Sequence, residues 1–295
     1  MKTQNRALAS RAALLGATLL WGTSFVILKN TLASVGPLWI LAIRFTLSAL
    51  LFGALAGKRL GQLPPRLWRG GLLLGLCIAA AYIVQTYGLL YTTPGKNAFL
   101  TAVYCVLVPF LAWEIYRRRP KPQHILGALL CLAGIGFVSL SGAESGFNKG
   151  DALTLLCGLF YALQIIVLEQ YGGEDGDALS LSAIEFTVAA LVCWAGALPF
   201  ESVPQNVPMD AWLTIAYLGF VCTGLCFFLE AWGMKYTPSS TAAVLMTLES
   251  VFGAVSSVLF YHEPVTPRLL LGFALIFLAV LMSETGLGLW EKVDG

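Results

Sequence analysis

The sequence predicts an all-α polytopic membrane protein with ten transmembrane helices, arranged as two inverted repeats of five helices each. Three observations predict this fold: apolar stretches along the whole chain, a concentration of Lys and Arg in alternate connections, and residues of the first half that recur in the second. Hydrophobic residues make up 58% of the 295 residues and charged residues only 12%, about half the charged share of a soluble domain. This composition is typical of a chain that crosses a lipid bilayer repeatedly.

Ten stretches are long enough to cross a bilayer, which requires about 20 predominantly apolar residues. Gly and Pro, which favour turns, separate them. The first stretch follows Lys2, Arg6 and Arg11 and so resembles a signal peptide, but it is long and no small-residue cleavage site follows closely, so we expect it to be an uncleaved span. The ten predicted spans are 11–30, 37–56, 70–91, 95–116, 123–141, 151–170, 178–199, 211–233, 238–261 and 266–286.

The distribution of basic residues predicts the orientation of the chain. If the N-terminus is cytoplasmic, 13 of the 18 Lys and Arg residues lie in cytoplasmic segments and three, Lys96, Lys149 and Arg268, in the outer loops. Cytoplasmic loops carry an excess of Lys and Arg. We therefore expect both termini to be cytoplasmic in a multi-pass plasma membrane protein, such as one of the bacterial inner membrane.

The two halves of the chain resemble each other. The segment 42–46, Ala-Ile-Arg-Phe-Thr, returns as Ala-Ile-Glu-Phe-Thr at 183–187, 141 residues later. Because five helices is an odd number, the second half must cross the membrane in the opposite sense to the first. We expect repeats at 1–141 and 151–295 with a linker at 142–150, and such halves are typical of transporters with a site at their interface. At an offset of 145, Gly88, Tyr91, Thr92, Leu100, Pro122 and Gly127 return as Gly233, Tyr236, Thr237, Leu245, Pro267 and Gly272.

Four of the charged residues inside the predicted spans need separate interpretation, because charge is costly there and normally faces the bundle interior or an aqueous cavity. Glu249 is the deepest; it could carry a proton, meet a substrate cation, or bond a neighbouring helix. Arg44 could anchor a substrate carboxylate or, by a slightly favoured interpretation, lock the fold. Glu185, the repeat partner of Arg44, should not contact it, and could bind substrate or lie partly exposed in a cytoplasmic vestibule. Glu230 matches Gln85 in the repeat, and we expect it to reach the membrane interface.

Neutral polar and aromatic side chains extend the set of candidate substrate-binding residues. Single Ser and Thr residues in a span usually bond a neighbouring helix, and a deep aromatic residue usually packs, so each has a structural interpretation beside the functional one. Together they would suit an amphipathic ligand with an apolar or cationic part. The candidates beyond Arg44, Glu185 and Glu249 are Trp21, Thr23, Tyr82, Gln85, Asn97, Thr101, Tyr104, Tyr161 and Gln164.

The remaining features predict neither a cofactor nor a metal. All seven cysteines lie in apolar stretches, which favours small buried side chains over disulfides or a metal pair. Spans 123–141 and 266–286 contain almost nothing polar, so we expect them at the periphery, where glycines such as Gly134 and Gly272 allow close helix packing or a dimer face. The net charge of +2 does not favour a nucleic-acid partner.

These residues resemble the EamA family of the drug/metabolite transporter superfamily. Its first-half pattern is similar to Trp21-Gly22, Pro37 followed by Arg44, and Gly127. Its second-half pattern is similar to Leu248-Glu249, Glu263 and Gly272. One departure is Ser250, where family members often have Pro, so the helix could run straighter there. The resemblance implies inverted five-helix repeats, a central cavity between helices 1–4 and 6–9, and export of amino acids or other small metabolites.

We therefore expect a secondary-active transporter that works by alternating access on a small-molecule substrate, with proton coupling as an option and a monomeric or homodimeric state. The alternative is efflux of drugs or amphipathic cations. A channel is less favoured, since inverted halves do not form a ring of like residues. We expect no enzyme activity, because the chain has no phosphate-binding loop, no H-E-x-x-H motif and no His deep in a span.

Overall fold

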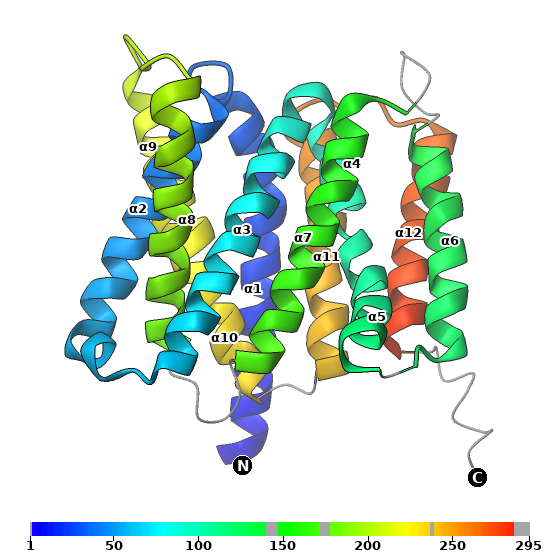
Figure 1. Ribbon diagram of the computed structural model, residues 1–295. Coiled ribbons are helices and arrows are strands. Elements are labelled where there is room, and N and C mark those ends of the chain that lie inside the picture. The colour runs from blue at the N-terminus through cyan, green and yellow to red at the C-terminus, as the bar shows by residue number, and fades with distance from the viewer. Residues whose placement is uncertain (1, 118, 140–146, 172–177, 237–238, 286–295) are drawn as a thin grey trace.

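The computed structural model describes residues 2–117, 119–139, 147–171, 178–236 and 239–285, and these residues form helices without a strand. Most helices stand side by side across one bundle (Figure 1). The elements are α1 (Lys2–Thr31), α2 (Pro37–Ala56), η1 (Gly57–Gln62), α3 (Pro65–Tyr91), α4 (Pro94–Thr101), α5 (Val103–Tyr116), α6 (Pro122–Ser139), α7 (Lys149–Tyr171), α8 (Ala178–Phe200), α9 (Met209–Tyr217), η2 (Leu218–Leu225), α10 (Cys226–Tyr236), α11 (Ser239–Phe260) and α12 (Pro267–Thr285).

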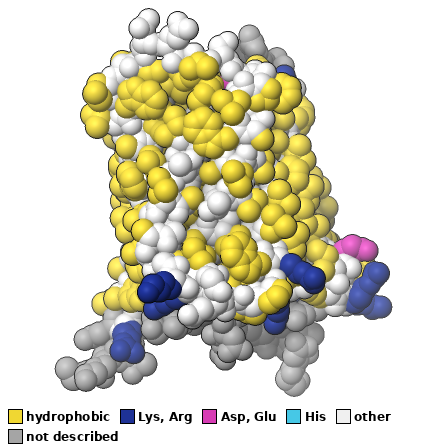
Figure 2. All heavy atoms as spheres, turned by 60° about the vertical axis from the view of Figure 1, so that its left-hand side comes forward, with side chains coloured by type: hydrophobic (Ala, Val, Ile, Leu, Met, Phe, Trp, Pro, Cys, Tyr) yellow, Lys and Arg dark blue, Asp and Glu magenta, His cyan; other side chains and the backbone are white. Residues whose placement is uncertain are grey.

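The apolar character of these helices makes this a multi-pass membrane protein. Within the described residues, seven helical segments are long and apolar enough to cross a bilayer, and the apolar helices at 122–137, 248–260 and 267–282 are shorter. Figure 2 shows an apolar surface on one side of the bundle, with Lys and Arg side chains gathered along its lower edge. Of the predicted linker at 142–150, residues 142–146 lie outside the described residues, and residues 149–150 begin α7.

The lower end of the bundle in Figure 1 is the end where α1 begins and α12 finishes. At the upper end, two carboxylates cap helices of the first half. Glu201, which follows α8, accepts hydrogen bonds from the backbone N–H groups of Leu38 (3.0 and 3.1 Å) and Trp39 (3.3 Å) at the start of α2. The N–H groups in the first turn of a helix have no acceptor within the helix, and the carboxylate supplies one. Its negative charge also complements the positive end of the helix dipole.

Glu263, which follows α11, caps α4 in the same way. Its carboxylate accepts hydrogen bonds from the Gly95 N–H (3.1 Å), the Ser257 hydroxyl (2.5 Å) and the Thr93 hydroxyl. Because α8 and α11 belong to the second half of the chain and α2 and α4 to the first, these two carboxylates connect the halves at the upper end.

Cations complete the contacts at this end. The Lys29 ammonium of α1 donates to the carbonyls of Leu89 (2.5 Å), Leu90 (3.2 Å) and Thr92 (3.0 Å), at the negative end of α3. Lys96, counted above as an outer-loop residue, is instead buried in α4. There it forms an ion pair of 3.1 Å with Asp151 of α7, because a buried charge requires an opposite one.

Two predicted spans are interrupted, contrary to the continuous helices expected at 95–116 and 211–233. The first divides into α4 and α5 at Ala102, where α7 crosses closely: a Cβ at Gly158 would lie 2.4 Å from the Val103 side chain. The second contains the π-helical segment η2 between α9 and α10. Its wider turn leaves carbonyls for other helices, and Gly219 accepts a hydrogen bond from the Ser48 hydroxyl at 2.9 Å.

The helices of one half pack largely against those of the other. The main pairs are α3 with α7, α2 with α8, α1 with α11, and α6 with α12. The last pair lies together at one edge of the bundle (Figure 1), as expected for spans almost without polar residues. Gly134 allows this approach, since a Cβ there would lie 2.9 Å from the Gly272 carbonyl oxygen.

We predict that replacing Glu263 or Glu201 by Gln lowers the stability of the protein by about 1–3 kcal/mol, since each change removes a charged acceptor from a helix start. Thermal unfolding of the purified protein in detergent would measure the loss. The control is Glu114→Gln, because the Glu114 side chain is 77% exposed and its ion pair with Arg117 spans 3.7 Å. Equal melting temperatures for all three variants would contradict the capping role.

Candidate functional site

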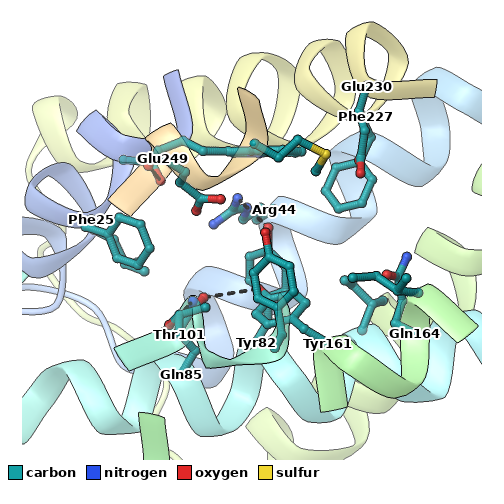
Figure 3. A pocket seen from close by; sticks show the side chains of 17 residues that line it. Phe25, Arg44, Tyr82, Gln85, Thr101, Tyr161, Gln164, Phe227, Glu230 and Glu249 are labelled. Carbon is teal, nitrogen blue, oxygen red and sulfur yellow. Dashed lines mark hydrogen bonds between the residues drawn. The ribbon is translucent and has the colours of Figure 1, made fainter. Parts of the chain in front are cut away.

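A cavity lies near the middle of the bundle, lined by helices of both halves (Figure 3). The space inside it that admits water is about 80 Å³, which is enough for several water molecules. Arg44 lies seven residues, or about 10 Å, below the start of α2, and Glu249 lies ten residues, or about 15 Å, above the start of α11. The lining residues are Trp21, Ser24, Phe25, Leu28, Arg44, Ile78, Tyr82, Gln85, Thr101, Tyr104, Tyr161, Gln164, Ile165, Phe227, Glu230, Met246 and Glu249.

The structure brings most of the candidate residues to this cavity. Three of the twelve lie outside its lining: Thr23, Asn97 and Glu185. The other nine come from α1, α2, α3, α4, α5, α7 and α11, so positions far apart in the sequence meet at one place. The nine are Trp21, Arg44, Tyr82, Gln85, Thr101, Tyr104, Tyr161, Gln164 and Glu249.

Arg44 is the cation of the cavity and is only 2% exposed. Its Nε donates to the Thr223 hydroxyl of η2 (2.5 Å) and its Nη2 to the Tyr82 hydroxyl (3.4 Å), with the guanidinium carbon 4.7 Å from the centre of the Tyr82 ring. Within the described part of the chain, no carboxylate oxygen lies within 4.0 Å of its nitrogens. Neutral hydroxyl groups therefore hold the guanidinium in place without neutralising it.

Glu249 and Glu230 are the anions of the cavity. The structure gives neither carboxylate a hydrogen bond or an ion pair with a described residue. Figure 3 shows the Glu249 side chain pointing toward the Arg44 guanidinium, with Glu230 on the far side of Arg44 beside Phe227. Both carboxylates belong to second-half helices, whereas Arg44 belongs to a first-half helix.

The expectation that Glu230 reaches the membrane interface is wrong, because its side chain lines the cavity. The wider turn of η2 changes the register of α10 relative to a continuous helix, so the face that carries Glu230 turns inward. A signal for this position was present in the sequence. Gln85, its repeat partner, also lines the cavity, as do Trp21 and Tyr161, which lie 140 residues apart in the first helices of the two halves.

Hydrogen bonds and ring contacts order the neutral wall of the cavity. The Gln85 side-chain amide donates to the Thr101 hydroxyl (3.1 Å), and the Tyr161 hydroxyl donates to the side-chain oxygen Oε1 of Gln85 (3.2 Å). Tyr161 also packs edge-on against Tyr82, with ring centres 5.7 Å apart. The indole N–H of Trp21 donates to the Cys222 carbonyl of η2 (2.6 Å). The wall therefore presents fixed polar groups between aromatic surfaces.

The three candidates outside the cavity contact neighbouring backbone or helices. The Thr23 hydroxyl donates to the Leu20 carbonyl of its own helix (2.9 Å). Asn97 is fully buried, and its amide donates to the Thr154 hydroxyl of α7 (2.8 Å) and the Gln85 carbonyl (3.3 Å). Glu185 is 3% exposed, not partly exposed in a vestibule, and accepts a hydrogen bond from Gln164 (3.3 Å).

Several lining residues carried no sequence signal of their own. Phe25, Phe227 and Met246 are ordinary apolar residues of membrane helices, and only the packing of the bundle turns them inward. Thr223 likewise becomes a partner of Arg44 because η2 presents it to α2. In the described ranges, no group of three His, Cys, Asp or Glu side chains could hold a metal ion.

Comparison with known proteins assigns the chain to a family. The sequence model of the EamA-like transporter family matches residues 11–140 and again residues 148–285. The chain belongs to the EamA-like transporter family. The resemblance to the drug/metabolite transporter superfamily is thereby confirmed, and the chain is a membrane transporter, not an enzyme.

Relatives of this EamA protein are named as transporters. A protein of Archaeoglobus fulgidus named an uncharacterized transporter is 32% identical over 264 residues, which cover 90% of this chain and 82% of that protein. The uncharacterized transporter YvbV of Bacillus subtilis is 26% identical over 285 residues, or 94% and 92% of the two chains. The threonine/homoserine exporter RhtA of Escherichia coli is 27% identical over 178 residues, or 59% and 58%.

A solved crystal structure has the same fold. It superposes with a TM-score of 0.69 at 19% sequence identity, covering 94% of this chain and 96% of the other. The arrangement of helices is therefore shared with a known protein over nearly the whole length.

We predict that Thr223→Val lowers stability by about 1–3 kcal/mol, since it leaves a buried charged donor of Arg44 without its acceptor. Thr223→Ser keeps the hydroxyl and should cost less. Thermal unfolding of both variants in detergent measures the difference. If the Thr223 hydroxyl acts through Arg44, adding Thr223→Val to an Arg44→Gln variant should lower stability only slightly further. A double variant whose loss of stability equals the sum of the two single losses would contradict this pairing.

Proposed function

We propose that this EamA-family transporter is a secondary-active exporter of amino acids or other small metabolites that works by alternating access. The observation that carries the proposal is the central cavity, which holds charges of both signs and is lined by both halves. A buried charge that faces a cavity without a partner is costly unless a ligand or an ion meets it. The cavity therefore supports a role in moving a polar solute across the membrane.

The packing of the helices supports ten spans in two inverted repeats. In this scheme the spans are α1, α2, α3, α4–α5 and α6, repeated as α7, α8, α9–α10, α11 and α12. In inverted repeats, each helix contact has a counterpart in which both helices are replaced by their repeat partners. The counterpart of the α3–α7 contact is α1–α10, and that of the α1–α11 contact is α5–α7. Both counterparts are present. The contacts α2–α8, α6–α12 and α4–α11 join repeat partners to each other, so the exchange leaves them unchanged. In Figure 1, α1 rises from the lower end while α7 descends to it.

The surface charge supports a cytoplasmic location for the lower end. Basic side chains gather along the lower edge in Figure 2, at the end where α1 begins. By the positive-inside rule this end faces the cytoplasm of the cell that makes the protein, and both termini lie there in a plasma membrane such as the bacterial inner membrane.

Alternating access then requires the halves to separate at the upper end. In the structure this end is held by contacts between the halves: Glu201 with the start of α2, Glu263 with the start of α4, and Lys96 with Asp151. Release to the outside would break these contacts as the halves rock around the cavity.

The substrate class follows from the relative RhtA and from the cavity. RhtA is named a threonine/homoserine exporter, and a cavity with charges of both signs accommodates an amino acid. Efflux of amphipathic cations is the second candidate, favoured by the carboxylates and by the aromatic wall of Trp21, Tyr82 and Tyr161. The protein works in this proposal as a monomer or homodimer, with a proton as the coupling ion.

We predict that the purified protein in liposomes exchanges labelled for unlabelled solute in counterflow, with L-threonine and L-homoserine as the first solutes. Counterflow requires a site that faces the two sides alternately, so a channel or receptor would not show it. The control is empty liposomes prepared in parallel. The proposal would be contradicted if, for every amino acid and amine tried, the rate of labelled uptake were the same with and without unlabelled solute on the other side of the membrane.

We predict that Glu249→Gln lowers transport while the protein still expresses and folds, because the change removes a charge from the cavity and leaves the side-chain shape. A counterflow series from acidic to alkaline pH measures the effect. The charged and titratable groups that face the same cavity are Arg44, Tyr82, Tyr104, Tyr161 and Glu230. An unchanged rate at every pH would exclude Glu249 from the mechanism, and Glu114→Gln is the matched control far from the cavity.

A further inference from the structure

Three charged side chains of the cavity remain without an opposite charge at ion-pair distance. Among the described residues, no carboxylate oxygen lies within 4.0 Å of the Arg44 nitrogens, and neither Glu230 nor Glu249 has an ion pair or hydrogen bond. A buried charge is normally paired. Figure 3 shows that these groups share one hollow, with Glu249 pointing toward Arg44.

The guanidinium of Arg44 has more N–H donors than the two that Thr223 and Tyr82 accept from. Arginine carries five N–H donors in a planar fork that matches a carboxylate. Thr223 accepts from Nε and Tyr82 from Nη2, and both acceptors are neutral. They hold the fork in a defined orientation against α3 and η2 while its charge stays available. The missing partner of Arg44 is therefore an anion.

The carboxylate of Glu249 requires a cation as its partner. Its carboxylate lines the cavity and accepts no hydrogen bond from a described residue. It points toward Arg44, yet the two groups are too far apart for a direct ion pair. A ligand that carries an anion and a cation on one carbon atom would fill such a gap, with its carboxylate at Arg44 and its ammonium at Glu249.

From this geometry, and resting on the transport function proposed above, we propose that Arg44 and Glu249 bind the two ends of a zwitterionic α-amino acid head group. Arg44 takes the carboxylate in a bidentate contact, and Glu249 takes the ammonium. Phe25 lies on the Glu249 side of the cavity and Phe227 on the Glu230 side, so apolar surface is present for the substrate side chain (Figure 3).

The alternative charge classes fit these groups less well. A purely cationic drug or amine would satisfy the carboxylates but leave Arg44 unpaired and repel it. An organic anion would satisfy Arg44 but leave Glu230 and Glu249 unmatched. A zwitterion satisfies one group of each sign, and Glu230 is then left for the coupling proton.

The test compares each amino acid with two derivatives that lack one charge. The full-length protein in detergent is melted with L-alanine, L-serine, L-threonine, L-homoserine and L-phenylalanine, and with the methyl ester and the N-acetyl derivative of each. A ligand that binds the folded state raises its melting temperature. We expect at least one parent amino acid to stabilise the protein, and both of its derivatives to bind at least about tenfold more weakly, since each leaves one buried charge unpaired.

Two variants assign the ends of the ligand. Arg44→Gln should weaken binding of the amino acid and remove its advantage over the methyl ester, because the carboxylate no longer finds a cation. Glu249→Gln should remove the advantage over the N-acetyl derivative and leave the advantage over the methyl ester. The controls are Glu114→Gln and Arg119→Gln, which change exposed charges. A loss of discrimination that is the same in both cavity variants would overturn the assignment of ends.

Other outcomes separate this inference from the transport function. Equal stabilisation by a parent amino acid and its ester or N-acetyl derivative overturns the inference. So does an absence of stabilisation by all five amino acids. Counterflow of a purely cationic solute would overturn it while the transport function stands. Amino-acid binding without counterflow of any solute would support the inference and contradict the transport function.

Discussion

A polar atom inside a bilayer has no water to bind, so each buried donor and acceptor must find its partner within the protein. Arg44 shows how much of the bundle this constraint organises. Its guanidinium binds Thr223 in η2 and Tyr82 in α3, and so joins α2 to a helix on either side. The π-helical turn that presents Thr223 also leaves carbonyls that accept from Trp21 of α1 and Ser48 of α2. A single buried cation is thus part of a polar network that holds four spans around the cavity.

The same constraint acts at the helix ends. The first N–H groups and last carbonyls of a helix lack internal partners, and at the upper end of this bundle charged side chains supply them. Glu201 and Glu263 of the second half cap helices of the first, and Lys29 caps the end of α3. At the lower end Arg66 donates to the Gln170 carbonyl (2.8 Å), while basic side chains gather at the surface (Figure 2). Charged contacts between the halves therefore concentrate at the end opposite the start of α1.

This pattern distinguishes structural charges from those of the site. Lys96 and Asp151 neutralise each other, and Glu185 receives a hydrogen bond from Gln164. By contrast, the carboxylates of Glu230 and Glu249 line the cavity and have no partner among the residues that the structure describes. This contrast supports the proposal that these carboxylates bind a solute or an ion. The family assignment agrees with this interpretation, since EamA-like proteins are transporters.

Composition and spacing determined the class of this protein, because a bilayer imposes the same length and polarity on every span. Most of the described residues in the predicted segments are helical. Nine of twelve candidate residues line the cavity, since a polar or aromatic side chain deep in a span is disfavoured facing lipid. Tertiary packing alone decided the rest. α7 packs closely beside the break at Ala102, and the wider turn of η2 sets the register in which Glu230 faces the cavity. Asn97 and Glu185 were indistinguishable from lining residues in sequence, and only the position of the neighbouring helices shows that they form hydrogen bonds with Thr154 and Gln164.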